Sequence, residues 1–427
     1  MIPEASAELS NWAGNHRYSA TAVHHPETLD ELRRLASTLP SLRALGTRHT
    51  FTAMGDAGQL VALDRLAGAA EIAIDREQMT VTVGPAVTYA QLAEKLEADG
   101  LALANMASLP HISVIGAVIT GTHGSGDALG NLATSVRALR LVTSTGDVIE
   151  IGERDRRFPG AVVNLGAIGI VTHLTVAVEP SYQLWQRVYV GMEWDQLAQN
   201  LDAITSAGRS VSVFHRFGER VREVWVKGEA AAPQPASLFG AHPATEPRNP
   251  VPGSDPSYAT AQLGVLGPWC ERLPHFRAGF TPSAGEEIQS EWFVAREDAI
   301  AALTALREQL APRIRPILYV AETRTIAADE LWLSPHHQRD SIGLHFTWHR
   351  EPEAVGKMCA EVERVLGPFS PRPHWGKVFE QGAATIASRY PRLADFDALR
   401  GELDPRGAFS NAWLSQKLLP DAPHPTA

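Results

Sequence analysis

Hydrophobic and polar residues follow two periods in the first part of the chain, and together they predict short helices packed on strands. Leucines recur at helical spacing over 24–38 (HHPETLDELRRLAST), where Thr28 can cap the helix. The stretch 80–100 (TVTVGPAVTYAQLAEKLEADG) predicts a strand, a Gly-Pro turn and a capped helix. The stretch 138–151 (ALRLVTSTGDVIEI) predicts a hairpin, and 169–180 (GIVTHLTVAVEP) alternates as a further strand. The pattern therefore predicts an α+β domain up to about residue 180.

The second part of the chain begins with a change of pattern. Residues 228–256 carry seven prolines and no period, which predicts a long loop. Residues 297–310 (EDAIAALTALREQL) predict an amphipathic helix, and 340–349 (DSIGLHFTWH) predict an alternating strand. We therefore expect a first domain over 1–180, a second domain over 181–376, and a return of the chain to the first domain over 377–427.

Composition and charge narrow the class of protein. The formal net charge of −10 argues against nucleic acid or an anionic membrane as a partner. The first fifteen residues resemble no signal peptide, and no run of about 18 apolar residues occurs, so we expect a cytoplasmic protein. The two cysteines, Cys270 and Cys359, form no C-x-x-C pair, so neither a disulfide framework nor a thiolate metal site is expected. No protein partner is evident.

One uncharged, glycine-rich run suggests a phosphate site. Residues 105–126 (NMASLPHISVIGAVITGTHGSG) place hydroxyls between glycines, which suits a pyrophosphate held by backbone N–H groups and hydroxyls. A tightly packed turn region is the alternative. The run is neither a dinucleotide fingerprint nor a P-loop, and the chain contains no H-E-x-x-H and no G-x-S-x-G. Rossmann, P-loop, metalloprotease and α/β-hydrolase chemistry are therefore disfavoured, and no metal is expected.

Three later segments place polar residues in apolar surroundings. Glu322 and Arg324 are two residues apart, so both project from one face of a strand. His345 and Thr347 share a face in the same way, and Lys377 follows Trp-Gly. An ion pair across the strand face and a solvated lysine are the alternatives. Together these groups could bind a substrate rich in hydroxyls.

The segments taken together resemble one family. They are NWAGN (11–15), LGTRHTF (45–51), the run 105–126, and the motifs ETRT, HFTW and RPHWGKVF. They are similar to those of the alditol (xylitol) oxidases, flavoproteins of the vanillyl-alcohol-oxidase type, and the similarity spans about residues 11–415. The resemblance implies a two-domain α+β fold: an FAD-binding domain, an inserted substrate (cap) domain, and the C-terminal return.

The resemblance also implies a covalent flavin. His49 occupies the position of the family's histidine, which is bonded to the 8α-methyl group of FAD. Thr47, Arg48 and Thr50 replace the family's Ser, Gly and Ser, so the conformation of this loop is the point of departure. The residues expected to bind the cofactor are His49, Arg43, Ala44, Leu45, Gly46, Thr47, Arg48, Ser108, Ser113, Gly116, Thr120, Gly121, Thr122, His123, Val171 and Asn411.

The resemblance assigns roles at the substrate end as well. The expected substrates are a polyol and O2: hydride leaves the terminal carbon for flavin N5, and O2 becomes hydrogen peroxide. Lys377 would stabilise the alkoxide, His345 is the candidate proton acceptor, and Ser108 would lie near flavin and substrate. Ser108, Glu322, Arg324, Thr347 and Lys377 are expected to bind the substrate. Two alternatives stay open, an aldonolactone oxidase or dehydrogenase of the same superfamily and a non-catalytic flavin-binding protein.

Overall fold

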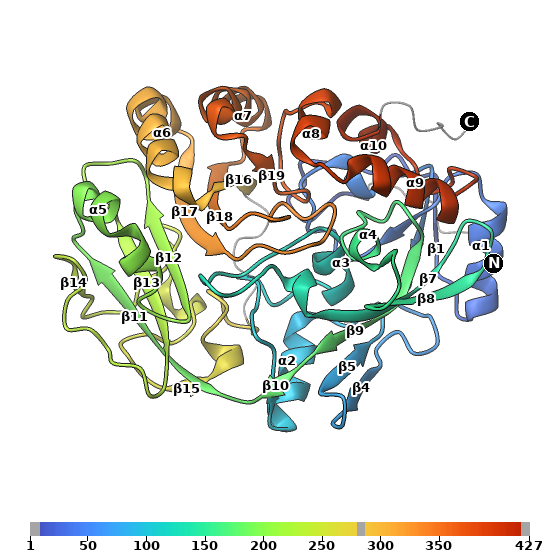
Figure 1. The fold of residues 1–427 in the computed structure, drawn as a ribbon, viewed down its shortest axis with the longest axis horizontal. Helices are drawn as coiled ribbons and strands as arrows, with labels where there is room; N and C mark the ends of the chain where they lie inside the picture. The colour runs from blue at the N-terminus through green and yellow to red at the C-terminus, as the bar shows by residue number, and fades with distance from the viewer. Residues whose placement is uncertain (1–8, 280–286, 420–427) are drawn as a thin grey trace.

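The computed structural model describes residues 9–279 and 287–419. Figure 1 shows two groups of strands side by side, with the N-terminal elements in one group and the middle of the chain in the other. The final helices lie back against the N-terminal group. The fold therefore combines helices and sheets, as expected from the sequence, and its strands form two groups.

Three small sheets build the N-terminal part of the described chain. Strands β1 (Ala22–His24), β3 (Gln59–Ala62) and β2 (Arg43–Leu45) form a parallel sheet in that order. An antiparallel sheet has the order β4-β5-β9-β7-β8, and β6 pairs with β10. These strands are β4 (Ile72–Asp75), β5 (Thr80–Val83), β6 (Leu101–Ala102), β7 (Val136–Val142), β8 (Val148–Gly152), β9 (Ile170–Ala177) and β10 (Glu179–Pro180).

The two helices that the sequence predicts in this part begin at the expected capping residues. In α1 (Leu29–Thr38) the Thr28 side chain accepts from the Glu31 N–H. In α2 (Tyr89–Ala98) Thr88 and Gln91 form a capping box, an arrangement that satisfies two backbone N–H groups at the helix start. The hairpin β7–β8 turns at Gly146, whose φ of 84° favours glycine. Two short helices, α3 (Val114–Ile119) and α4 (Phe158–Ala161), complete this part.

A large sheet dominates the second part. Within the described residues it has nine strands in the order β14-β11-β13-β12-β17-β18-β16-β19, with β15 paired to β11. The strands are β11 (Gln183–Val190), β12 (Ser210–His215), β13 (Glu223–Glu229), β14 (His242–Pro243), β15 (Gly267–Pro268), β16 (Glu287–Ala295), β17 (Leu318–Ile326), β18 (Ser341–His349) and β19 (Arg372–Pro373). Three helices accompany it: α5 (Trp194–Thr205), α6 (Ala299–Ile314) and α7 (Pro352–Leu366).

Strand alternation gives this sheet one apolar face and one polar face. On β18, Phe346 stacks on Trp348 at 4.9 Å and meets Trp292 of β16 edge-on. The Trp292 indole N–H donates to Glu363 of α7 at 3.1 Å, so this apolar face packs against the helices. His345 and Thr347 therefore point to the opposite face, as the sequence pattern predicts.

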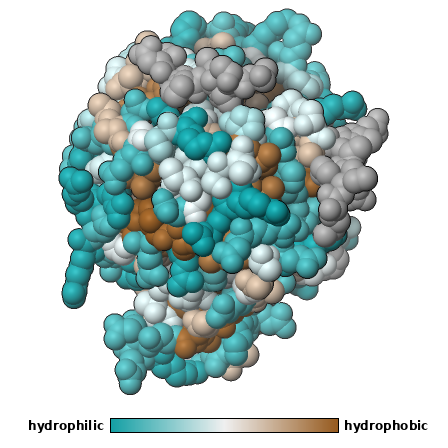
Figure 2. All heavy atoms as spheres, turned by 90° about the vertical axis from the view of Figure 1, so that its right-hand side faces the viewer, coloured by the Kyte–Doolittle hydropathy of each residue, from teal (hydrophilic) through white to brown (hydrophobic). Residues whose placement is uncertain are grey.

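The C-terminal segment returns to the N-terminal part. It consists of α8 (Ala383–Arg389), α9 (Leu393–Leu403) and α10 (Ala412–Lys417). Asn411 caps α10 and donates to the carbonyls of Ala53, Met54 and Asp56. Figure 2 views the end of the molecule that these helices share with the first sheets, where hydrophilic side chains predominate. Among the described helices none has the length and apolar composition needed to cross a bilayer.

Candidate active site

A cavity of about 840 Å³ lies between the two parts of the fold. This volume is at the upper end of the usual range for ligand sites, about 300–1,000 Å³. Its wall comes from residues 43–51, from the run 107–123, from the large sheet and from residues 374–377. The two parts of the fold therefore each supply one side of a single site.

The loop that carries His49 has a residue in the left-handed backbone conformation, held by hydrogen bonds to the N-terminal segment. Arg48 has a φ of 61°, the left-handed region that disfavours a Cβ by roughly 1–2 kcal/mol. Its carbonyl accepts from the Trp12 N–H at 2.8 Å, and its guanidinium donates to the Ser10 carbonyl at 3.1 Å. The arginine thus adopts the conformation for which a glycine is suited, and the N-terminal segment holds it there. Its side chain is committed to Ser10.

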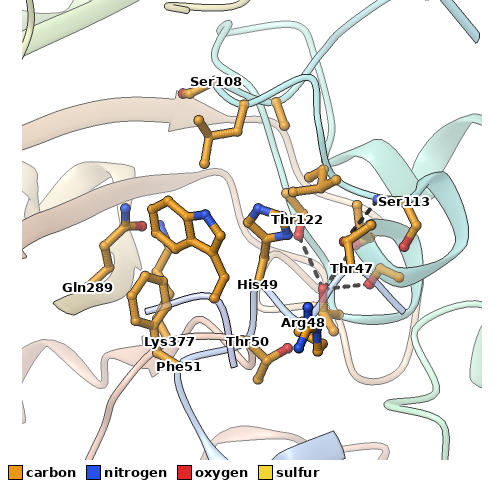
Figure 3. Close-up of a pocket in the computed structure, with 18 of the residues that line it drawn as sticks. Thr47, Arg48, His49, Thr50, Phe51, Ser108, Ser113, Thr122, Gln289 and Lys377 are labelled. Carbon is orange, nitrogen blue, oxygen red and sulfur yellow. Dashed lines mark hydrogen bonds between the residues drawn. The ribbon is translucent and has the colours of Figure 1, made fainter. Parts of the chain in front are cut away.

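The His49 imidazole has a nitrogen without a partner. Its ring stacks on Trp12, with centroids 5.3 Å apart. Nδ1 is buried and has no hydrogen-bond partner among the described residues. Burial, aided by His111, lowers the pKa of His49 to about 4, so the ring is neutral at pH 7. Figure 3 shows His49 at the centre of the cavity, with Thr47, Ser113 and Thr122 on one side.

The glycine-rich run approaches this loop closely. The Ser113 N–H donates to the Thr47 hydroxyl at 3.3 Å. A Cβ on Gly46 would lie 3.3 Å from the Ser113 hydroxyl, and one on Gly116 would lie 2.6 Å from it. The Ser113 side chain makes no capping bond at the start of α3, so its hydroxyl faces the cavity uncommitted. Glycine at 46 and 116 keeps the backbone accessible to a ligand.

Most residues expected to bind the cofactor line the cavity. Gly121 and Asn411 do not: Gly121 faces Pro335, and Asn411 holds the 53–56 turn. The Arg43 guanidinium is also committed, since it donates to the carbonyls of Phe409 and Leu165. The lining residues of the expected set are Arg43, Ala44, Leu45, Gly46, Thr47, Arg48, His49, Ser108, Ser113, Gly116, Thr120, Thr122, His123 and Val171.

The polar face of the large sheet supplies the other wall. His345 of β18 is in register with Glu291 of β16 on one side and Glu322 of β17 on the other. These three side chains form one row across the sheet, and the next row contains Gln289 and Thr347. All the residues expected to bind the substrate, Ser108, Glu322, Arg324, Thr347 and Lys377, line this end of the cavity.

Glu291, which was not among the residues predicted from the sequence, links these groups. It is 0% exposed, and its carboxylate accepts from Lys377 Nζ at 2.6 Å and from Arg324 Nη2 at 3.1 Å. Arg324 crosses over β18 to reach it, at the level where Gly343 has no side chain. The alternation Glu-Ile-Gln-Ser-Glu over 287–291 was an available signal, because it places Glu291 on one face with Gln289.

The charges in this network fix its protonation states. Burial raises the pKa of Glu291, but Lys377, His123 and Arg324 outweigh it and hold that pKa well below its usual range. Burial lowers the pKa of Lys377, and Glu291 opposes this shift. The carboxylate is therefore ionised at neutral pH, and it favours the ammonium form of Lys377.

His345 is neutral in this setting and has a defined tautomer. Burial and the neighbouring Lys377 lower its pKa to about 4. Nδ1 lies 2.8 Å from Lys377 Nζ and 3.4 Å from Oε2 of Glu291; the shorter contact is with an ammonium, so Nδ1 accepts, and Nε2–H donates to the Thr347 hydroxyl at 3.0 Å. On the same wall, Arg324 Nη1 donates a hydrogen bond to the Ser108 hydroxyl at 3.3 Å. This bond links the large sheet to the glycine-rich run.

His123, Glu291 and His374 have the residue types of a metal site. Their ligand atoms lie within 4.8 Å of one another. A dication there would meet Lys377 and Arg324, which already pair with both oxygens of the carboxylate. We interpret the group as part of the ion-pair network.

Comparison with known proteins identifies relatives of the whole chain. A model of an FAD-binding domain matches residues 20–152, and a model of D-arabinono-1,4-lactone oxidase matches residues 284–417. An alditol oxidase from Streptomyces sp. (strain IKD472 / FERM P-14339) is 46% identical over 418 residues, 97% of this chain and 99% of the relative.

More distant relatives share the same extent. L-gulono-1,4-lactone dehydrogenase of Mycobacterium tuberculosis is 28% identical over 433 residues, 96% of this chain and 99% of its own length. The crystal structure of a cholesterol oxidase from B. sterolicum superposes with a TM-score of 0.76 over 96% of both chains at 15% identity, a likeness of fold. Identity of 46% over nearly full length places the chain in the alditol oxidase family, a family of FAD-dependent oxidoreductases.

Proposed function

We propose that the protein is an FAD-dependent alditol oxidase with a covalently bound flavin. It oxidises the terminal primary alcohol of a polyol such as xylitol or sorbitol to the aldose, and O2 is reduced to H2O2 (R–CH2OH + O2 → R–CHO + H2O2). The observation that carries the proposal is the wall of paired, buried polar groups facing His49 across one cavity. A polyol has neither charge nor a large apolar surface, so such hydrogen-bonding groups must supply its recognition.

The N-terminal wall fits FAD. A neutral imidazole with an unpartnered Nδ1 is the nucleophile that attachment to the 8α-methyl group requires, and Trp12 fixes its plane. The close approach at Gly46 and Gly116 and the hydroxyls of Ser113, Thr120 and Thr122 suit a pyrophosphate. Bound there, FAD would supply the hydride acceptor and the route of the electrons to O2.

The residues of the large sheet orient the substrate and stabilise its oxygen. Lys377, held by Glu291, supplies a positive charge for the developing alkoxide. Glu322 accepts hydrogen bonds from the substrate hydroxyls, and Arg324 donates to them. Arg324 and Ser108, which are hydrogen-bonded to each other, together fix the position of the polyol. When the Lys377 ammonium turns to the substrate oxygen, Nδ1 of His345 is released and can accept the proton.

The test is the anaerobic reduction of the bound flavin. Purified protein mixed with xylitol should lose its yellow absorbance without air, recover it on aeration, and release stoichiometric H2O2. L-gulono-1,4-lactone is the comparison, since lactone-oxidising relatives share the fold. Reduction by the lactone and not by xylitol, sorbitol or glycerol would replace the proposal with the lactone alternative, and no reduction by either would support a non-catalytic flavoprotein.

Three further predictions stand beside this one. We propose the division into an FAD-binding domain (1–180), a substrate domain (181–376) and a return segment (377–427). Within the described residues, every strand of the large sheet lies between 183 and 373, which supports these boundaries. A cytoplasmic location, and polyol and O2 as the only partners, stay predictions from the sequence.

A further inference from the structure

A lysine is buried beside the substrate wall without touching a carboxylate. Lys227 of β13 is 1% exposed, and no ion pair joins it to any carboxylate of the described chain. Its ammonium donates to the carbonyls of Leu273 and Pro274 and to Nδ1 of His275, the last at 3.2 Å. Burying an ammonium costs several kcal/mol, so a lysine used this way calls for a reason.

The contact with Lys227 determines the tautomer of His275. Burial lowers the pKa of Lys227 to about 7, so below neutral pH the lysine is an ammonium; Nδ1 can only accept from that ammonium, which places the ring proton on Nε2. That Nε2–H donates to Oε1 of Glu322 at 2.8 Å, with the Ser212 hydroxyl 3.4 Å from the same nitrogen. Burial and Lys227 lower the pKa of His275 to about 4, which agrees with a neutral ring.

The His275 ring is also fixed in orientation. Phe214 and Trp225 meet it edge-on, with centroids 5.4 and 5.6 Å away, and the ring is 4% exposed. The ring cannot rotate between these neighbours without displacing them, so its Nε2–H has one direction. Lys227, His275 and Glu322 thus form a directed chain that ends at the cavity.

This chain divides the two oxygens of Glu322 between two tasks. Oε1 accepts from His275 and lies 3.5 Å from Arg324 Nε. Oε2 has no hydrogen-bond partner among the described residues, and Glu322 lines the cavity. One oxygen is anchored to the protein, and the other is left for substrate hydroxyls.

We propose that Lys227 and His275 are positioning residues that act through Glu322: Lys227 sets the tautomer of His275, and His275 fixes the carboxylate that accepts the polyol hydroxyls. The proposal rests on the proposed polyol oxidation. Without the ammonium, the carbonyls of Leu273 and Pro274 lose their donor and favour the Nδ1–H tautomer of His275, in which Nε2 faces the carboxylate as a second acceptor. Glu322 turns away, and polyol binding weakens.

The experiment is a double-mutant cycle on xylitol kinetics of the flavin-loaded protein at pH 6, where Lys227 is an ammonium. Lys227→Met and His275→Leu should each raise the KM for xylitol about tenfold or more, the value of a hydrogen bond to a charged group. The limiting rate of flavin reduction should fall much less. With Glu322→Ala already present, either substitution should change the KM by less than about threefold, since the acceptor through which it acts is gone.

A conservative variant tests the tautomer itself. His275→Gln keeps a donor near the Nε2 position and has no ring tautomer, so it should restore the xylitol KM to within about threefold. Adding Lys227→Met to His275→Gln should then have no further effect. This pair also serves if His275→Leu fails to fold, because glutamine keeps the volume and polarity of the site.

His215 provides the matched control. It is equally buried on β12, faces the other side of the sheet, and contacts Thr323 rather than Glu322. His215→Leu should leave the xylitol KM unchanged. Additive effects in the cycle, an unchanged KM in Lys227→Met and His275→Leu, or a failure of His275→Gln to restore the KM would each overturn the proposal. If xylitol does not reduce the wild-type flavin, the proposed function fails. If it does and the variants behave as wild type, only the positioning role of Lys227 and His275 is overturned.

Discussion

Replacing Glu291 with glutamine removes the charge that holds two buried cations together. Its carboxylate lies 2.6 Å from Lys377 and 3.1 Å from both Arg324 and His123, and no part of it is exposed. The amide keeps the volume and one acceptor oxygen, but it turns an N–H toward groups that are themselves donors. Glu291→Gln therefore tests electrostatics with little change in packing.

The magnitude follows from the remaining partners. Removing one member of a buried ion pair costs about 3–5 kcal/mol. We expect about 3 kcal/mol at pH 6, the low end, because Glu322 stays 3.5 Å from Arg324. Glu291 also opposes the lowering of the Lys377 pKa, so its loss lowers that pKa further. In the variant, Lys377 of the folded chain therefore loses its proton at a lower pH than Lys377 of the unfolded chain. The free energy of unfolding of the variant then rises relative to that of wild type as pH rises toward 9.

The assay is urea unfolding of the flavin-loaded protein at pH 6 and pH 9. Glu223→Gln is the matched control, since Glu223 is a buried carboxylate of β13 that pairs with Arg222 and Trp225 outside the cavity. Burial raises its pKa, so ionisation of this carboxylate contributes less to stability, and the amide should cost less than at Glu291. Equal losses in the two variants at pH 6, or a loss at Glu291 that is the same at both pH values, would refute the reasoning.

The remaining predictions concern the flavin and its loop. After acid precipitation the flavin should stay with the wild-type polypeptide and appear in the supernatant for His49→Ala; release from wild type would remove the covalent bond. Because the pKa of His49 is about 4, the rate of flavin attachment to apoprotein should change by less than about twofold from pH 8 down to 5.5, whereas an ordinary histidine, with a pKa of about 6.5, would lose about tenfold. Lys377→Ala should slow anaerobic reduction by xylitol far more than reoxidation by air, and equal slowing would take Lys377 out of the hydride step. Arg48→Gly should raise the free energy of unfolding by roughly 1 kcal/mol, because glycine has no Cβ at a φ of 61°, and calorimetry showing a loss would contradict this.

Local patterns predicted the elements because their causes are local. The cap at Thr28, the capping box at Thr88 and the turn at Gly146 each depend on residues within four positions of one another. The alternation at His345 placed it on the polar face of β18 for the same reason. Asn411 was expected to bind the cofactor. In the structure its side chain donates to carbonyls of the 53–56 turn, some 350 residues away in sequence, a contact that no local pattern predicts.

The network around the substrate could not be predicted in the same way. Glu291, His345 and Glu322 come together only because β16, β18 and β17 are neighbours in that order, and the sequence does not state strand order. His345 and Glu322 could be recognised from their strand patterns, whereas Glu291, the carboxylate that joins Lys377 to Arg324, lies in a strand that was not among those predicted. A pattern gives the face of a residue, and the sheet decides its neighbours.

The two buried carboxylates of this site differ in what surrounds them, and the difference separates their tasks. Glu291 has cations or donors on both oxygens and no exposure, so it serves to hold the protein groups around it: Lys377, Arg324, His123 and, at 3.4 Å, His345. Glu322 has one oxygen anchored by His275 and the other facing the cavity, so it can exchange partners with a ligand. A carboxylate that is saturated by the protein positions other groups, whereas one left half-satisfied binds substrate. This distinction predicts that substitutions at Glu291 act first on stability and on Lys377, and substitutions at Glu322 act first on polyol affinity.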